Sequence, residues 1–272
     1  MDKVIIYDRE PNDHIPRWLN GLLEYIRNKN LAIELCHGKK IPDFNNCKLF
    51  MIWNGTEPIH QNILNKAREH NIKTLFIECA WFPQSKFYYV DENGINADSS
   101  LMNDDFSWIS GNHIDRLNEF SKKYLYDMLW KAPGKYITVP LQLDNDTNII
   151  KNAPFKNMQS FIDHVEQTFP DNFILFKTHP VLPNLSYRVK GTNVLVRSGS
   201  FLELSQEAKL VYGQTSTALL ETCLMGVPTI AIGKCLLSKH RGNEKNLLAA
   251  LVHKQIPVGE TNLDYWLEKY VS

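Results

Sequence analysis

Two hydroxyl side chains, Ser216 and Thr217, stand where an apolar run gives way to a segment with helical periodicity. Residues 210–212 predict a buried strand and residues 216–225 a helix. The first turn of a helix offers unpaired backbone N–H groups, so this junction suits a phosphate, although the same residues also make an ordinary helix N-cap. Glu221 lies farther along the predicted helix, where it could reach the ribose hydroxyls of a nucleotide or simply face solvent.

A lysine and a histidine follow another strand-like run. Residues 173–176 predict a strand that ends at Lys177, His179 and Pro180. Open α/β sheets bind ligands at the carboxyl ends of their strands, so a cation here can neutralise a leaving phosphate. A lone histidine is usually an ordinary surface or core residue, so a functional His179 depends on its pairing with the Ser-Thr turn.

Carboxylates occupy two further strand ends. Asp144 and Asp146 follow a predicted strand at residues 136–141, and Glu78 closes one at residues 74–78. Carboxylates that face each other across a cleft are the groups that glycosyl chemistry uses. Asp-rich turns also form for structural reasons, because Asp side chains bond their own backbone. A calcium loop is a further interpretation, but the Gly and the later Glu of such a loop are missing.

The composition narrows the range of functions. Lys plus Arg and Asp plus Glu each total 30, so the net charge is zero and nothing favours nucleic-acid binding. The motifs G-x-G-x-x-G, Walker A, H-E-x-x-H and G-x-S-x-G are absent, which weakens dehydrogenase, P-loop kinase, zincin and esterase interpretations. The five cysteines form no C-x-x-C pair, which favours reduced thiols. Without a leader or a membrane-spanning run, we expect a cytoplasmic protein.

The elements that must hold these residues alternate between short β-branched runs and longer amphipathic ones. This alternation predicts an α/β fold with mostly parallel sheets in two halves. A long helix expected over residues 114–130 is stopped by a Pro-Gly pair, which sets the domains at 1–134 and 135–272. A closing helix over residues 263–270 is expected in the second domain. Residues 79–105 have no long periodic segment, and such a stretch is more often functional than decorative.

Five motifs together resemble the bacterial capsule and lipopolysaccharide β-Kdo glycosyltransferases, which are also described as capsule polysaccharide biosynthesis proteins. Each motif is weak alone, and the resemblance depends on their order and spacing between residues 76 and 233. The motifs are P-L-Q-x-x-x-D at 140–146, K-x-H-P at 177–180, S-T-x-x-x-E-x-x-x-x-G-x-P at 216–228, E-x-x-W-x-P-Q at 78–84 and D-x-x-G-x-N at 91–96.

The resemblance implies a GT-B-like enzyme in which two Rossmann-like halves face a central cleft, the first on the acceptor side and the second binding the donor. It implies retaining transfer of Kdo from CMP-β-Kdo to a surface polysaccharide or glycolipid, with no cofactor and no metal. Asp146 would be the nucleophile, a cationic His179 would contact the donor phosphate, and Glu78 would be the acid/base for the acceptor. A carboxylate nucleophile splits the substitution into two inversions, which gives net retention.

The resemblance divides the remaining site residues between the two substrates. Ser216 and Thr217 would hold the phosphate, Glu221 the ribose, and Gln142 would help to shape the pocket, with Lys177 as a further donor-binding cation. The acceptor-side candidates are Gln84, Asn96 and Ser99. Attachment to the periphery of the inner membrane and contacts with polysaccharide assembly proteins are part of the same expectation.

Three other functions stay open on the sequence. A sialyltransferase would use a CMP-sugar with the same carboxylated anomeric centre, but an inverted product would overturn the role of Asp146. A nucleotide-sugar epimerase of the same fold would turn over the donor without an acceptor. A non-catalytic module would use the sheet edge only to hold a glycan.

Overall fold

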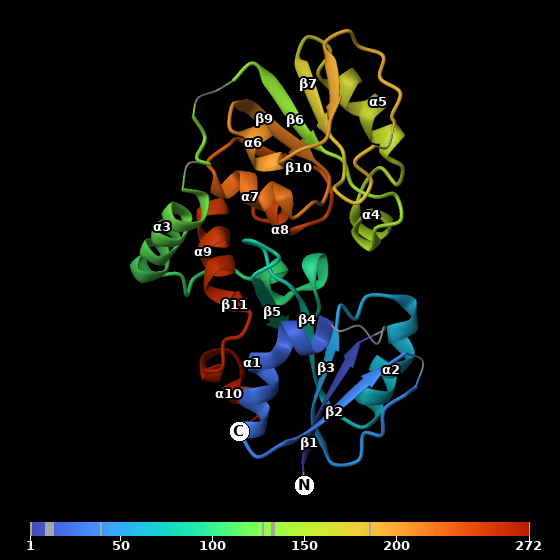
Figure 1. Cartoon of the computed structure of the whole chain (residues 1–272), viewed down its shortest axis with the longest axis vertical. Coiled ribbons are helices and arrows are strands. Elements are labelled where there is room, and N and C mark those ends of the chain that lie inside the picture. The colour runs from blue at the N-terminus through green and yellow to red at the C-terminus, as the bar shows by residue number, and fades with distance from the viewer. Residues whose placement is uncertain are drawn as a thin grey trace. The chain divides into compact units, whose positions relative to one another are not determined.

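The computed structural model describes residues 2–8, 14–38, 40–126, 128–131, 134–184 and 186–271, and for residues 14–18 only the backbone. The chain forms two compact units (Figure 1). Unit 1 comprises Met1–Asp104 and Lys254–Ser272, and unit 2 comprises Asp105–His253.

Unit 1 is a six-stranded sheet in the order β11-β5-β4-β3-β1-β2. Strands β1 to β4 pair in parallel, whereas β5 pairs antiparallel with both β4 and β11. The strands are β1 (Lys3–Asp8), β2 (Ala32–His37), β3 (Cys47–Trp53), β4 (Lys73–Cys79), β5 (Phe87–Asp91) and β11 (Ile256–Pro257). The helices are α1 (His14–Asn28), α2 (Pro58–Glu69) and α10 (Asp264–Val271), with the 3-10 turns η1 (Asn96–Asp98) and η2 (Ser100–Asn103).

The C-terminal segment belongs to the core of unit 1. Ile256, Leu263 and Leu267 are fully buried in one cluster with Leu22 of α1 and Val4 of β1. The division therefore differs from the expected boundary after residue 134, and the closing helix packs in the first unit rather than the second. Helical periodicity locates a helix in the sequence but does not say which sheet its apolar face covers.

Unit 2 is a five-stranded, all-parallel sheet in the order β10-β9-β6-β7-β8. Its strands are β6 (Tyr136–Pro140), β7 (Phe173–Lys177), β8 (Val194–Arg197), β9 (Ala208–Gly213) and β10 (Thr229–Ala231). Its helices are α3 (Gly111–Leu125), α4 (Thr147–Asn152), α5 (Met158–Thr168), α6 (Phe201–Ser205), α7 (Ala218–Leu224), α8 (Leu236–Lys239) and α9 (Glu244–Lys254). The predicted α/β class with parallel sheets is confirmed.

Helices cover both faces of the unit 2 sheet (Figure 1). On one face α5 buries Phe161 and Val165 against Val139 of β6 and Phe176 of β7. On the other face the Thr138 hydroxyl donates to the Leu204 carbonyl of α6, at 3.1 Å. Both faces of β6 are therefore covered, as expected for a strand of a parallel sheet. The ends of the strands are the parts of the sheet that these helices do not cover.

Two expected segments differ from the structure. The helix expected over 114–130 ends at Leu125, because Tyr126 adopts a φ of 38° and the chain leaves the helical path. The stretch 79–105 is not irregular throughout, since it contains β5 and both 3-10 turns. Asp91 organises its loop, because its buried carboxylate accepts hydrogen bonds from the backbone of Asn93 and from Ser100. In the part of the chain that the structure describes, none of the helices has both the length and the apolar character to cross a bilayer.

Candidate functional site

The candidate donor site lies at the carboxyl edge of the unit 2 sheet, where three neighbouring strands end. Thr138 of β6 is in register with Leu175 of β7 and Val211 of β9, so these strands end at one edge. The chain passes from β6 to β7 on one side and later enters β9 on the other (Figure 1). The strand order therefore reverses between β6 and β9, and α/β sheets bind ligands at such a switch point.

Gln142 joins the two loops that flank this switch point. Its Oε1 accepts from the backbone N–H of Thr215 at 3.2 Å, and its Nε2 donates to the Thr215 hydroxyl, also at 3.2 Å. Both residues are buried, so these bonds fix the β6 and β9 loops relative to each other. The predicted role of Gln142 in shaping the pocket stays a prediction, with this geometry as its physical basis.

The two carboxylates of the Asp-rich turn have different surroundings. Asp144 uses both oxygens, accepting from the Met158 N–H at 2.7 Å and from Asn157 Nδ2 at 3.2 Å. Asp146 is the N-cap of α4, where its Oδ1 accepts from the Asn148 N–H at 2.7 Å. Its Oδ2 has no hydrogen-bond partner among the described residues. Asp146 thus keeps an oxygen available for chemistry, whereas Asp144 is committed to the start of α5.

The loop after β7 fixes the tautomer of His179. The Val181 N–H donates to His179 Nδ1 at 3.2 Å, so in the neutral ring the proton resides on Nε2. Burial and the nearby Lys177 ammonium lower the pKa of His179, while the Asp146 carboxylate raises it. The balance lowers the pKa of His179 and favours a neutral imidazole with an Nε2–H donor, whereas the sequence led us to expect a cationic ring. The Asp146 carboxylate therefore acts on His179 through its charge. The contact of His179 with the donor phosphate stays a prediction.

Lys177 is buried, and its ammonium donates to the Thr178 carbonyl at 2.6 Å. Burial lowers the pKa of this amine. The Thr178 hydroxyl in turn donates to the Pro183 carbonyl at 3.0 Å, which closes the same loop. In this structure Lys177 therefore supports the loop that carries His179, and its predicted contact with the donor stays a prediction.

The Ser-Thr turn and Glu221 lie on the other side of the switch point. The Ser216 hydroxyl accepts from the Ala218 N–H at 3.3 Å, whereas Thr217, the residue before α7, makes no side-chain cap. The Thr217 hydroxyl has no partner within the described residues. Glu221 is largely buried, which raises the pKa of its carboxyl, and its Oε1 accepts from the hydroxyl of Tyr124 at 2.7 Å.

The acceptor-side candidates all lie in unit 1. Glu78 of β4 accepts from Asn54 Nδ2 at 3.0 Å and from the Cys79 N–H at 2.9 Å. It stands opposite Tyr89 of β5, whose hydroxyl accepts from the N–H of Asn96 at 3.1 Å. Ser99 is buried, and its hydroxyl has no partner in the described part of the chain. The side chain of Gln84 is exposed on a turn.

Sequence reasoning missed Asn54, Tyr89 and Tyr124 as neighbours of the predicted site residues. Asn54 follows β3 directly, so its place at a strand end was a usable signal. Tyr89 and Tyr124 lie within regular elements, and nothing in the local pattern sets them apart.

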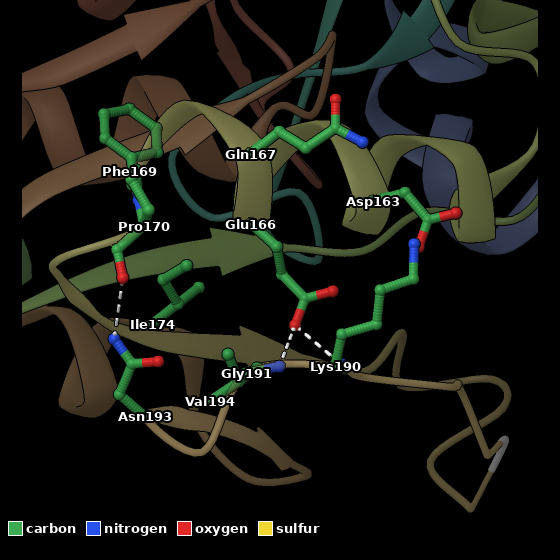
Figure 2. Close-up of a pocket in the computed structure, with 10 residues that line it drawn as sticks. All are labelled: Asp163, Glu166, Gln167, Phe169, Pro170, Ile174, Lys190, Gly191, Asn193 and Val194. Atoms are coloured by element: carbon green, nitrogen blue, oxygen red, sulfur yellow. Dashed lines mark hydrogen bonds and ion pairs between the residues drawn. The ribbon is translucent and has the colours of Figure 1, made fainter.

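A separate hollow of about 310 Å³ opens at the opposite, amino end of the unit 2 strands (Figure 2). Ile174 and Val194 near the starts of β7 and β8 form part of its wall, together with Phe169. Glu166 joins α5 to the segment before β8, because its carboxylate accepts from the backbone N–H groups of Lys190 and Gly191, both at 2.8 Å (Figure 2). The hollow contains none of the predicted site residues.

The segment that holds Asp146, His179 and Ser216 resembles a known protein family. The sequence profile of the family described as "Capsule polysaccharide biosynthesis protein" matches residues 113–240. The match confirms the family that the motifs of this segment predicted. Among curated proteins, no sequence matches the chain.

Two solved structures share the fold of this chain. The β-Kdo 2,4 transferase of Thermosulfurimonas dismutans KpsC superposes with a TM-score of 0.68 and 15% identity, over 99% of this chain and 98% of that one. The β-Kdo 2,7 transferase of the same KpsC has a TM-score of 0.63 and 15% identity, over 97% of this chain and 100% of that one. The likeness extends over both units, so the fold of the whole chain is shared.

Proposed function

We propose that this chain is a retaining glycosyltransferase that moves Kdo from CMP-β-Kdo to a surface polysaccharide or glycolipid. The observation that carries the proposal is the placement of Asp146 after β6, at the switch point of the sheet, with one carboxylate oxygen that has no hydrogen-bond partner among the described residues. Its charge acts on His179, and both residues lie in the segment that matches the capsule family. The shared fold with the two Kdo transferases supports the choice of sugar.

In the proposed first step, Oδ2 of Asp146 attacks the anomeric carbon of Kdo. The bond from that carbon to the phosphate oxygen breaks, and CMP leaves with the electron pair. Hydrogen bonds from His179 Nε2–H and from the Thr217 hydroxyl stabilise the charge that develops on the phosphate. On the same proposal, Ser216 also holds the phosphate. CMP leaves as an anion, so this step needs no proton from the enzyme.

In the proposed second step, a hydroxyl of the acceptor displaces Asp146 from the anomeric carbon. Glu78 takes the hydroxyl proton as general base, and the second inversion restores the original configuration. Gln84, Asn96 and Ser99 are assigned to the acceptor on the same proposal. Glu221 holds the ribose, and Lys177 adds positive charge near the phosphate.

The proposed setting is the cytoplasmic face of the inner membrane, where the chain would work beside polysaccharide assembly proteins. No metal and no cofactor has a part in the proposed steps. Neutral His179 and uncharged hydroxyls supply hydrogen bonds to an anion, which act most strongly where water is excluded.

The test is intact-protein mass spectrometry after mixing the chain with CMP-β-Kdo and no acceptor. We expect released CMP and one Kdo unit attached to Asp146, with an adduct absent from Asp146→Asn. With an acceptor, NMR of the product should show the donor's anomeric configuration. An inverted product would refute the covalent step and favour a sialyltransferase-like reaction. Donor turnover to a free epimer would favour an epimerase, and binding without turnover a glycan-binding module.

A further inference from the structure

Two helices far apart in the sequence are joined by one polar contact inside unit 2. The hydroxyl of Tyr124 on α3 donates to Oε1 of Glu221 on α7, at 2.7 Å and across 97 residues of sequence. Both partners are at least half-buried, so water competes weakly for this bond. A hydrogen bond to a charged group in such surroundings is among the stronger ones in proteins.

The contact occupies only one of the two carboxylate oxygens of Glu221. Oε1 is bonded to Tyr124, and Oε2 has no hydrogen-bond partner within the residues that the structure describes. Burial raises the pKa of the Glu221 carboxyl, and the Tyr124 bond opposes this by stabilising the ionised form. Burial also raises the pKa of the Tyr124 hydroxyl, so it stays a donor at neutral pH. The arrangement fixes Oε1 and leaves Oε2 available to accept a hydrogen bond from a ligand.

We propose that Tyr124 is a positioning residue that orients Glu221 so that Oε2 receives the ribose hydroxyls of the cytidine nucleotide. This inference rests on the proposed function, since it takes CMP as the ligand of unit 2. A glutamate side chain has three rotatable bonds, and a bond from a second helix selects one orientation before the nucleotide arrives. Tyr124 itself does not need to touch the nucleotide.

The test compares CMP with 2′,3′-dideoxy-CMP, which lacks both ribose hydroxyls, by isothermal titration calorimetry. In Tyr124→Phe we expect the Kd for CMP to rise about tenfold, the lower range for a hydrogen bond to a charged group. The Kd for the dideoxy nucleotide should stay within about twofold of wild type, since it cannot use Glu221. Tyr212→Phe is the matched control, because it removes a tyrosine hydroxyl that contacts His164 at 3.1 Å in the same unit. It should bind both nucleotides as wild type does.

A pH series separates positioning from a general loss of packing. In the wild type, the affinity for CMP should decrease as the pH is lowered, because Glu221 becomes protonated. In Tyr124→Phe that inflection should move to higher pH, because the bond that favours the ionised carboxylate is gone. Glu221→Gln retains an acceptor for Tyr124 but no charge, so it should weaken CMP and remove the inflection.

The outcomes distinguish the two proposals. Equal weakening of both nucleotides in Tyr124→Phe, or no weakening of either, would overturn the positioning role while leaving the CMP site in place. If Tyr124→Phe did not fold, Glu221→Gln would decide, since equal loss of both nucleotides there would also overturn the role. A wild-type chain that binds neither nucleotide would instead refute the proposed function.

Discussion

Replacement of Asp146 tests the proposed nucleophile most directly, provided that its structural role is kept. Oδ1 of Asp146 caps α4 through the Asn148 N–H at 2.7 Å. Asp146→Ala removes this cap and should cost about 1 kcal/mol of the free energy of unfolding. Asp146→Asn retains the cap, since Asn caps about as well as Asp, but it removes the charged oxygen. We therefore expect Asp146→Asn to lose about 10³-fold or more in kcat with stability nearly unchanged.

Asp144→Asn is the matched control in the same turn. The side-chain oxygen of the new asparagine can still accept from the Met158 N–H. Its NH2 group, however, would face the Asn157 Nδ2 that donates to Asp144 in the wild type, so that hydrogen bond is lost. We expect a loss of about 1 kcal/mol in stability and little change in kcat.

Urea unfolding gives the stabilities of these variants, and release of CMP in the presence of acceptor gives the rates. A kcat for Asp146→Asn within tenfold of wild type would refute the assignment. So would an equal loss of kcat in Asp144→Asn, because the effect would then belong to the fold of the turn rather than to one oxygen.

Three further predictions address charge and packing. CMP affinity should stay level between about pH 7 and 8.5, because neutral His179 donates through Nε2 throughout; a steady decline across this range on calorimetry would point to a cationic ring. Lys177→Met should raise the pKa of His179 in an NMR titration, since the Lys177 charge lowers it, and an unchanged value would contradict that cause. Gly21→Ala should destabilise unit 1 by roughly 1–3 kcal/mol or more in urea, because its Cβ would lie 2.0 Å from the Glu260 carbonyl oxygen. Gly111→Ala should change the free energy of unfolding little, because its Cβ would meet nothing within 4 Å. Equal stabilities of the Gly21→Ala and Gly111→Ala variants would disprove the packing of the C-terminal segment on α1.

The stability of the folded chain should also depend on the protonation of His179. Its pKa in the folded chain lies below the ordinary value of 6.5, so the unfolded chain binds a proton first as the pH falls. The free energy of unfolding should therefore decline as the pH drops below about 6.5. His179→Gln should reduce this part of the decline in urea titrations at several pH values. An unchanged slope would contradict the lowered pKa.

The sequence predicted elements well where one face of a helix or strand is buried. The apolar residues from Met158 to Val165 recur at helical spacing, and this pattern predicts a helix over residues 158–168, which are the bounds of α5. Helix α9 was missed because it is buried nearly all round, from Leu247 to Val252, so it shows little periodicity. The place of α10 in unit 1 depends on contacts between distant segments, which no local pattern contains.

The candidate site was predictable in its location but not in its electrostatics. Strand ends of a parallel sheet share an edge, and strand prediction alone placed Asp146, His179 and Ser216 after β6, β7 and β9, which are neighbours in one sheet of unit 2. The neutral state of His179 depends on its burial and on the Lys177 charge, and its tautomer on the Val181 N–H. These contacts form only when the loop folds, so the residue types could not show them.

Unit 1 is built from two segments that flank unit 2 in the sequence, and this affects the order in which the units can fold during translation. Unit 2 is one continuous stretch, Asp105–His253, and all of its strands are available once that stretch has emerged. Unit 1 needs β11 and α10, which are translated after unit 2. Until then its β5 edge and the apolar face around Leu22 lack their partners, so the first unit to be made is the last to be completed.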